Sequence, residues 1–453
     1  MNRLYPFFFV TCISFLSPCI HAEETFAERF QNLPKSARGP SAVLRIDTLS
    51  TDTALERIDQ LSDMGFGGVL LTLSSADDAA WGKITKLTTR ASELQMEVGI
   101  QDFLLSTNET AQVDVFDEKA LSQHINKLLS GLQTRLDRHY FKTLTWLLMK
   151  SHPNTSPSRP SDLDTLFFNR TGFHLPTLLP AQEGDDLEDS DAAAYAREQV
   201  ASIITDAWRT RFAGQARDTV QEAGLEAGIM ANELWIPPEE AGKYFMRPVL
   251  TGCATSTTER AINRRIAKGA HTADRYNIMG HLPLERVQPI SVPTLFVCKH
   301  EMDRLFMDGA THLLLDSGET AWQDETLFTD AEIACLYARR WQFILQQSNP
   351  FDASSITWQT KETNVEMCAI ARKRSNEHIY CIMNDSPHGG SVTGIFKEKI
   401  NGSPPEYWSA ENGEIIPLDS AVQVGDAQTS IRFFIEPYGA FFVVFKQDGE
   451  TVK

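Results

Sequence analysis

The stretch Gly67-Gly68-Val69-Leu70-Leu71-Thr72-Leu73 contains no charged residue and does not alternate between apolar and polar side chains. A strand of this composition is buried on both faces, as the strands of a parallel sheet are. Similar short segments recur along the chain, separated by stretches in which apolar residues have helical spacing. Together they predict eight strands, at residues 43–47, 67–73, 97–102, 144–149, 226–232, 249–253, 277–280 and 311–315.

Helices are predicted between these strands. One opens with the capping box Thr53-Ala54-Leu55-Glu56 and ends at Gly65, and another opens with Ser256-Thr257-Thr258-Glu259. Eight strand–helix units predict an α/β fold of the TIM (β/α)8 barrel type. An open doubly wound sheet is the alternative, but no glycine-rich phosphate loop follows the first strand.

Two regions depart from this alternation. Residues 151–190 are rich in Pro, Ser and Asp, so we expect a long loop with little regular structure. Its acidic end, Glu183 to Asp191, lacks the ligand spacing of an EF-hand loop and is expected to be solvated. Beyond Pro350 only strand patterns occur, at 356–361, 365–372, 378–383, 390–396 and 431–445, with turn signals such as Asn412-Gly413. These patterns predict a small antiparallel β-sandwich.

The N-terminal segment has the features of an export signal. Arg3 precedes an apolar run from Leu4 to Leu16, and Ala22 provides a small residue for cleavage. The run is too short to span a bilayer, although a retained N-terminal anchor is the alternative. We therefore expect a signal peptide at 1–22, a barrel domain at 23–350 and a β-sandwich domain at 351–453. The protein would be secreted or periplasmic, with no membrane anchor after cleavage.

Composition and charge exclude some classes of partner. The 453 residues include 60 acidic and 42 basic side chains, for a net charge of −18, and 42% of the residues are apolar. This composition is that of an ordinary folded protein of two or three domains. The acidic balance counts against nucleic acid as a partner, because binding phosphates requires clustered Lys and Arg.

Signal cleavage removes two of the seven cysteines and leaves an odd number. Cys368 and Cys381 flank a predicted turn at 373–376 and would lie nearly opposite each other in a hairpin. They are the candidates for a disulfide, and an unpaired role in the core is the alternative.

The active site of a TIM barrel lies where the strands end and the following loops begin. The polar residues at the predicted strand ends include Asp47, Asp102, His152, Asn232, Glu233, Cys253, His281 and Asp316. Acids at several strand ends suit glycoside hydrolysis, in which one carboxyl protonates the leaving oxygen and another attacks carbon or activates water. Trp235, near one of these ends, is able to stack on a sugar ring. The alternative is that these side chains cap the following helices.

Other chemistries have weaker support. Cys253 and His281 form a candidate nucleophile–base pair on neighbouring strands, but no local motif supports it. The histidines show no H-x-H or H-E-x-x-H spacing, so no zinc site is predicted. His312 lies inside an apolar strand, and we expect it to be a hydrogen-bonded barrel residue rather than a metal ligand.

Several segments, in the same order along the chain, resemble the α-L-rhamnosidase-like glycoside hydrolases (family 106 and its relatives). Arg38-Gly39-Pro40, the helix 53–64 and Gly65-Phe66-Gly67-Gly68-Val69 are similar to the family's entry into its barrel. The other similar segments are 167–175, 178–181, 223–225, Asn232-Glu233, Ala270-His271, 405–408 and 436–445. The resemblance spans most of the mature chain. It implies a TIM barrel with a closing β-sandwich and action on glycosidic bonds.

The sequence departs from this family at several strand ends. The family commonly carries tryptophans at the end of the first strand, where this chain has Arg45-Ile46-Asp47. It commonly places a glutamate at the end of the sixth strand, where this chain has Cys253. It places another just after the seventh, where this chain has His281, with Glu285 four residues later. Glu233 is the acid that matches.

Two functions are compatible with these observations. The first is an exported glycoside hydrolase, rhamnosidase-like by the resemblance, with Glu233 as one carboxyl and Glu285 or Asp316 as the other. The candidates for substrate binding are Asp47, Asp102, His152, Asn232, Trp235 and His281, and Asp102 is also a candidate for the second carboxyl. The second function is a degenerate barrel that binds carbohydrate without hydrolysing it. Both take a carbohydrate or glycoside as partner. The residues themselves predict no cofactor or metal. The resemblance is compatible with a bound calcium ion.

Overall fold

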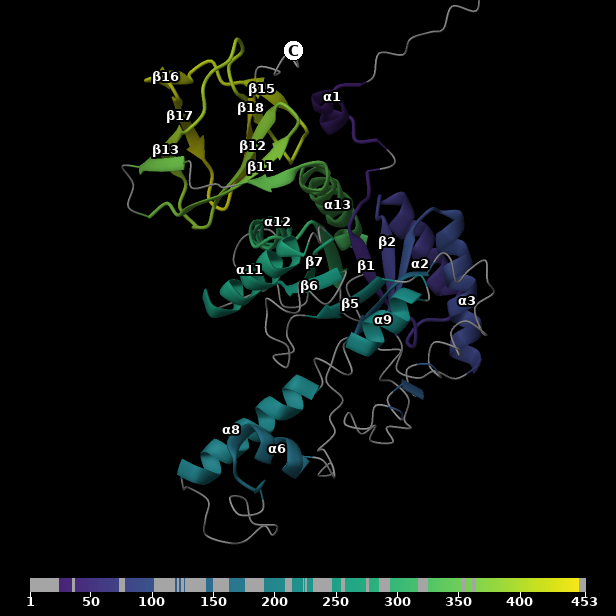
Figure 1. The fold of residues 1–453 in the computed structure, drawn as a ribbon. Coiled ribbons are helices and arrows are strands. Elements are labelled where there is room, and N and C mark those ends of the chain that lie inside the picture. The colour runs from purple at the N-terminus through teal and green to yellow at the C-terminus, as the bar shows by residue number, and fades with distance from the viewer. Residues whose placement is uncertain are drawn as a thin grey trace, which may run out of the picture.

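The structure, a computed structural model, contains a closed eight-stranded barrel followed by two antiparallel sheets (Figure 1). It describes residues 24–34, 37–72, 78–101, 119, 122–123, 126, 144–149, 163–175, 191–207, 214–222, 224, 226–230, 247–253, 257–273, 277–284, 294–316, 325–351, 356–360 and 364–447. The predicted fold class, a TIM barrel with a C-terminal β-sandwich, is therefore confirmed.

The barrel strands are parallel and pair in chain order. They are β1 (Ser41–Arg45), β2 (Gly68–Thr72), β3 (Glu97–Gln101), β4 (Leu144–Met149), β5 (Glu226–Met230), β6 (Arg247–Thr251), β7 (Met279–Pro283) and β8 (His312–Asp316). β1 pairs with both β2 and β8, which closes the barrel. Each strand overlaps a predicted one. The clearest difference is at β7, which continues to Pro283, so that His281 lies inside the strand rather than after it.

The helices around the barrel are α2 (Thr51–Asp63), α3 (Asp78–Glu93), α9 (Gly214–Glu222), α11 (Thr257–Thr272), α12 (Thr294–Met307) and α13 (Glu325–Gln346). The predicted capping box at the start of α2 is wrong. Ser50 is the N-cap, and its hydroxyl accepts a hydrogen bond from the backbone N–H of Thr53 at 3.1 Å. Thr53 therefore already belongs to the first turn. None of the described helices is both long enough and apolar enough to cross a membrane.

The sequence predicts little regular structure for residues 151–190, but α6 (Leu163–Thr171) lies within them. Leu163 and Phe167 are buried, and the carboxylate of Asp164 accepts a hydrogen bond from the backbone N–H of Leu175 at 2.7 Å. These contacts stabilise a helix that composition does not predict. α6 packs beside α8 (Asp191–Ala207), on the side of the barrel away from the β-sandwich (Figure 1). The acidic run preceding Asp191 lies outside the described residues.

Two glycine-containing segments are in backbone contact where the chain enters the barrel. The backbone N–H of Gly67 donates to the carbonyl of Pro40 at 3.0 Å. A Cβ atom on Gly39 would lie 1.9 Å from the carbonyl oxygen of Gly65, and one on Gly67 would lie 2.8 Å from the backbone of Gly39. No residue with a side chain fits so close an approach of the two backbones. The two family-like segments at this point, 38–40 and 65–69, therefore have a packing function.

The C-terminal β-sandwich consists of two antiparallel sheets. Its strands are β9 (Asn349–Phe351), β10 (Ile356–Thr360), β11 (Met367–Arg374), β12 (Glu377–Asn384), β13 (Gly390–Phe396), β14 (Glu406–Trp408), β15 (Ile415–Pro417), β16 (Val422–Val424), β17 (Gln428–Ile435) and β18 (Ala440–Lys446). One sheet has the order β15-β14-β18-β12-β11-β9, and the other has the order β10-β13-β17-β16.

The predicted strands of the β-sandwich are confirmed except at one place. The run 431–445 is two strands, β17 and β18, because the chain turns between them at Pro437 and at Tyr438, whose φ is +52°. The predicted turn at Asn412-Gly413 is present, and Gly413 adopts a φ of +75°. The short strands β9, β14, β15 and β16 were not predicted, since three residues carry too little periodicity to show a pattern.

Cys368 and Cys381 do not form the disulfide considered from the sequence, because both are free. In the β11–β12 hairpin Cys381 pairs with Ile370, so the two cysteines are two positions out of register. Cys381 is fully buried, and burial raises the pKa of its thiol to about 12. The alternative interpretation, an unpaired core residue, holds for Cys381.

α12 and α13 lie between the barrel strands and the β-sandwich (Figure 1). The short helix α1 (Phe26–Gln31) packs at the same junction. Phe30 is fully buried, with its ring centroid 4.8 Å from that of Trp408 and 5.8 Å from that of Phe442. Phe26 stacks on Phe343 of α13 at 5.0 Å. The N-terminal helix, the barrel and the β-sandwich therefore share one apolar core.

A group of polar and charged side chains also joins the two domains, and we call Arg260, His300, Arg304 and Asp385 the junction cluster. Asp385 follows β12 and accepts hydrogen bonds from Arg304 Nε at 2.8 Å and from Arg260. Nε2 of His300 lies 3.3 Å from Oδ1 of Asp385 without hydrogen-bond geometry. Burial raises the pKa of Asp385, but the hydrogen bonds and charges of Arg304 and Arg260 outweigh burial and hold that pKa below its usual value.

Candidate functional site

The inside of the barrel is layered. Five apolar side chains from five strands form a separate buried cluster in its middle, namely Val43, Leu70, Val249, Met279 and Leu314. Because side chains alternate along a strand, the residues two positions further on also face inward. They lie toward the C-terminal ends of the strands and are polar, and they include Arg45, Thr72, His281 and Asp316. This end of the barrel, which we call the mouth, is where TIM-barrel enzymes carry their active sites.

Three of these polar side chains meet, and we call Arg45, His281 and Asp316 the mouth trio. Nε2 of His281 lies 3.3 Å from Oδ2 of Asp316. A terminal nitrogen of the Arg45 guanidinium lies 3.5 Å from Oδ1 of the same carboxylate. The exposed fractions of the side chains are 13% for His281, 15% for Asp316 and 34% for Arg45. The carboxylate is thus largely enclosed, while the guanidinium stays accessible.

The electrostatics of the mouth trio favour an ionised Asp316. A nearby cation and a hydrogen-bond donor both stabilise a carboxylate over its acid form. Nδ1 of His281 is buried and has no hydrogen-bond partner in the described part of the structure. A proton on Nδ1 would leave a buried donor unsatisfied, so the tautomer that carries the proton on Nε2 and donates it to Asp316 is favoured. Asp316 therefore suits the role of a nucleophile or a base.

Hydrogen bonds from a surrounding helix and from the end of the neighbouring strand β6 support the backbone of this site. Lys83 of α3 donates to the carbonyls of Ile46 at 2.7 Å and Leu49 at 2.5 Å, which fixes the turn that follows Arg45. The backbone N–H of Gly252 donates to the carbonyl of His281 at 2.7 Å. Support of this kind holds functional side chains in a defined position.

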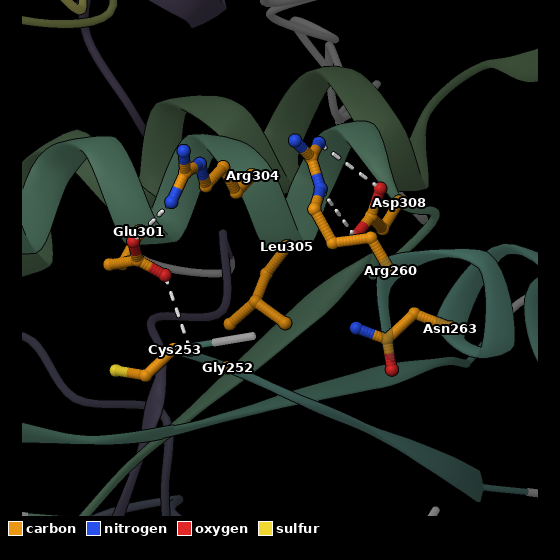
Figure 2. Close-up of a pocket in the computed structure, with 8 residues that line it drawn as sticks. All are labelled: Gly252, Cys253, Arg260, Asn263, Glu301, Arg304, Leu305 and Asp308. Atoms are coloured by element: carbon orange, nitrogen blue, oxygen red, sulfur yellow. Dashed lines mark hydrogen bonds and ion pairs between the residues drawn. The ribbon is translucent and has the colours of Figure 1, made fainter. Parts of the chain in front are cut away.

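A pocket lies between the end of β6 and the helices α11 and α12 (Figure 2). Its lining residues are Gly252, Cys253, Arg260, Asn263, Glu301, Arg304, Leu305 and Asp308. The empty space measures about 180 Å³, part of it open solvent, whereas ligand pockets begin at about 300 Å³. Its charged groups pair with one another, as Arg304 does with Glu301 at 2.9 Å. We therefore assign this pocket to the domain junction rather than to sugar binding.

Cys253 follows β6 in a left-handed backbone conformation, with a φ of +54°. Its backbone N–H donates to Glu301 at 3.1 Å, and its Sγ lies 3.9 Å from the carbonyl oxygen of Pro283. Nε2 of His281 is directed at Asp316 instead. The described contacts of the cysteine and the histidine thus lead to different partners and give no support to a nucleophile–base pair.

Three of the nine site residues predicted from the sequence lie in the described part of the chain. His281 and Asp316 come together in the mouth trio, whereas Asp47 lies in the turn after β1 with an exposed side chain. The other six lie outside the described residues, and they are Asp102, His152, Asn232, Glu233, Trp235 and Glu285.

His312 is hydrogen-bonded within the barrel, as the sequence predicts. Its Nε2 lies 3.0 Å from the hydroxyl of Ser41, and its Nδ1 lies 3.3 Å from the amide nitrogen of Gln342. Across the described ranges, no group of three or more His, Cys, Asp and Glu side chains is arranged to hold a metal ion.

Arg45 is the member of the mouth trio that was not predicted. The sequence analysis placed the end of the first strand at Asp47 and noted Arg45 only as a departure from the family. The strand ends at Arg45 itself, and alternation from Val43 turns its side chain inward. The sequence did contain a sign of this: Arg45 is a charged residue in a mostly apolar strand, at a position that alternation places on the inward face.

Sequence comparisons find no relative, and structural comparisons find several. No family model matches the sequence, and no curated protein matches it. The rhamnosidase from Novosphingobium sp. PP1Y is similar in structure, with a TM-score of 0.71 and 9% identity over 94% of this chain and 84% of that chain. The maltogenic α-amylase AmyB from Thermotoga neapolitana gives a TM-score of 0.49 with 12% identity, over 90% of this chain and 98% of that chain.

A β-L-arabinopyranosidase from Geobacillus stearothermophilus gives a TM-score of 0.49 with 9% identity, over 91% of this chain and 98% of that chain. The structural neighbours named here are thus glycoside hydrolases. At 9% identity, the rhamnosidase shows that the barrel and the β-sandwich occur together in another protein over nearly the whole chain. A shared fold does not define a reaction, which depends on the side chains at the mouth.

Proposed function

We propose that this chain is an exported glycoside hydrolase that acts at the mouth of its barrel, with Asp316 as one carboxylate of the catalytic pair. The observation that carries the proposal is the inward position of Asp316, enclosed and held by Arg45 and His281 at the C-terminal ends of the strands. The shared fold with a rhamnosidase supports it. The proposal includes membership of glycoside hydrolase family 106 and hydrolysis of rhamnosides.

The ionised state of Asp316 defines its part in the reaction. The partner carboxyl protonates the glycosidic oxygen as the leaving group departs. If the two carboxyls are about 5 Å apart, Asp316 attacks the anomeric carbon and forms a covalent intermediate that water then hydrolyses with retention. If they are roughly 6.5–9.5 Å apart, Asp316 activates a water molecule and the configuration inverts. Glu233 and Glu285 are the sequence candidates for the acid.

A second candidate function is a barrel that binds carbohydrate without cleaving it. The observation that favours it is the pair Cys253 and His281, which stand where the resembling family commonly carries glutamates. In this case Asp316 and His281 would bind sugar hydroxyl groups.

A substrate screen with chemical rescue separates the two functions. The secreted protein is assayed on aryl glycosides, rhamnosides among them, and on polysaccharides. Asp316→Gly is then assayed with and without azide, and Asp419→Asn, an exposed substitution in the β-sandwich, is the control. Turnover that Asp316→Gly loses and azide restores identifies Asp316 as the nucleophile or the base, and the anomeric configuration of the wild-type product decides between the two. Turnover that survives Asp316→Gly unchanged removes Asp316 from the site, and sugar binding without turnover on any substrate favours the second function.

Export is tested separately. The mature protein recovered outside the cytoplasm should begin at Glu23, as N-terminal sequencing or intact-mass measurement would show. A product that retains residues 1–22 would contradict the predicted signal peptide and support a retained N-terminal anchor.

A further inference from the structure

We propose that the barrel mouth accepts a sugar residue that carries an anionic group, a carboxylate or a sulfate, and that Arg45 recognises this group. The inference rests on the proposed glycoside hydrolase function and adds the class of its substrate. Arg45 would be a residue that determines specificity, in direct contact with the substrate.

The hydrogen-bonding capacity of Arg45 is largely unused. A guanidinium carries five N–H donors. In the described part of the structure its one contact is with Asp316 at 3.5 Å, which is longer than a hydrogen bond. Arg304, by contrast, donates to Asp385 at 2.8 Å and to Glu301 at 2.9 Å. Arg372 donates to the carbonyl of Leu345 at 2.6 Å. The donors of Arg45 are thus available to a ligand, as those of the structural arginines are not.

The place of Arg45 makes these donors useful. Its side chain faces inward at the end of β1, and its register partner is Thr72, which in turn pairs with Gln101. These neighbours are polar, so the wall around the guanidinium suits hydroxylated sugar. The side chain is 34% exposed, and Lys83 fixes the turn behind it. Arg45 is therefore a preorganised cation that a ligand in the mouth is able to reach.

The charge of the whole protein makes a local cation necessary for such a ligand. With a net charge of −18, the surface repels anions at long range, and the carboxylate of Asp316 repels them at short range. The guanidinium of Arg45 and the Nε2 donor of His281 offset the charge of Asp316. The remaining N–H groups of Arg45 match a carboxylate or sulfate in bidentate geometry, which a neutral hydroxyl group is unable to provide.

The experiment compares acidic oligosaccharides with their neutral counterparts. The probes are oligosaccharides that contain a uronic acid, the same oligosaccharides after reduction of the carboxyl to an alcohol, and sulfated oligosaccharides of the same backbone. Binding to the full-length mature protein is measured by calorimetry, and hydrolysis by release of reducing ends. We expect at least tenfold tighter binding of one acidic form than of the neutral form, and weaker binding as salt rises. The preferred acidic form identifies the anion as carboxylate or sulfate.

Two variants and one control assign the preference to Arg45. Arg45→Gln should remove the preference for the acidic form, a loss of about 10- to 100-fold, because it removes a charge-assisted hydrogen bond. Arg45→Lys should retain part of it. Arg57→Gln removes the same charge from the outer helix α2 and should leave the preference unchanged. Melting temperatures equal to that of the wild type would show that the variants are folded. If Arg45→Gln does not fold, the acidic preference of Arg45→Lys is compared with that of the wild type instead.

The outcomes separate this inference from the proposed function. Equal binding of acidic and neutral forms by the wild type, or a preference that survives Arg45→Gln, overturns the inference while hydrolysis of neutral glycosides still stands. Arg45-dependent binding of acidic forms with no hydrolysis of any probe supports the inference and counts against the proposed glycosidase.

Discussion

The mouth trio and the junction cluster are built from the same kinds of side chain, but their hydrogen bonds are used differently. Each combines an aspartate with a histidine and arginine. In the junction cluster, Asp385 accepts hydrogen bonds from two arginines, one of them at 2.8 Å. In the mouth trio, the shortest contact of Asp316 with the other two members is 3.3 Å, and the arginine lies at 3.5 Å.

This difference distinguishes a structural cluster from a candidate active site. Strong hydrogen bonds to an enclosed aspartate stabilise the fold, because removing one partner leaves a charge unpaired. The longer contacts of Arg45 and His281 with an aspartate at the mouth of a barrel suit a side chain that binds or reacts with a ligand. Substitutions in the junction cluster should therefore change stability and spare activity, and substitutions in the mouth trio should do the reverse.

The largest effect is expected from Asp316→Asn. The amide keeps the shape of the side chain but removes the charge that, in the proposed function, attacks carbon or activates water, so kcat should fall by roughly 10²- to 10⁴-fold. The melting temperature should stay within a few degrees of wild type, since Arg45 remains accessible to water. Steady-state kinetics and calorimetry measure the two quantities. A variant that melts much earlier but keeps its kcat would place Asp316 among the structural aspartates.

Asp385→Asn should show the opposite pattern. It leaves Arg260 and Arg304 without their shared carboxylate, so the free energy of unfolding should fall by about 3 kcal/mol. Chemical denaturation measures this loss, and kcat per folded molecule should be unchanged. Asp419→Asn, the same substitution at an exposed position of the β-sandwich, should cost less than about 0.5 kcal/mol. Equal effects of the two substitutions would mean that the junction cluster does not hold the domains together.

The barrel could be predicted from the sequence because its strands are short, apolar and separated by helical patterns. Those signals are local, and each of the eight strands overlaps its predicted range. The junction cluster could not be predicted, because Asp385 meets Arg260 across 125 residues and no local pattern marks either one. α6 was missed for a similar reason, since the burial of Phe167 depends on tertiary packing.

The candidate site was predicted in part. Asp316 ends an apolar strand, which marks it plainly, and His281 was found although its strand runs two residues beyond it. Arg45 was missed because the pairing of β1 with β2 ends at Arg45, whereas the β-propensity of Ile46 extends the predicted strand beyond it. The contact between β1 and β8 depends on barrel closure, which no segment of the sequence encodes by itself.

The histidine of the junction cluster should make stability depend on pH. Burial, with a further contribution from Arg304, lowers the pKa of His300 to about 3, despite the opposing charge of Asp385. Below pH 6.5 the unfolded chain binds a proton that folded His300 does not, so stability falls as the pH decreases toward 3. Between pH 6.5 and 5 this amounts to roughly 2 kcal/mol. His300→Gln should remove this dependence, as denaturation curves at pH 7 and pH 5 would show.

The quantity to compare is the difference in the free energy of unfolding between wild type and His300→Gln at each pH. Burial raises the pKa of Asp303 well above its ordinary value, so its contribution to stability has the opposite sign and falls as pH rises. Asp303 is the same in both proteins, and its contribution cancels when one curve is subtracted from the other. A difference that is identical at pH 7 and pH 5 would show that His300 is protonated equally in the folded and unfolded chains.

The smallest effect is expected at His281, the histidine of the mouth trio. If its function is to donate from Nε2 to Asp316, His281→Gln retains a donor, whereas His281→Ala removes it and should lower kcat/KM by about tenfold. Partial rescue by glutamine, with both limbs of the pH profile intact, would identify His281 as a positioning residue. Equal losses in the two variants, with one limb of the pH profile gone, would show that His281 itself transfers the proton. In that case a histidine would take the place of one carboxyl in the proposed catalytic pair.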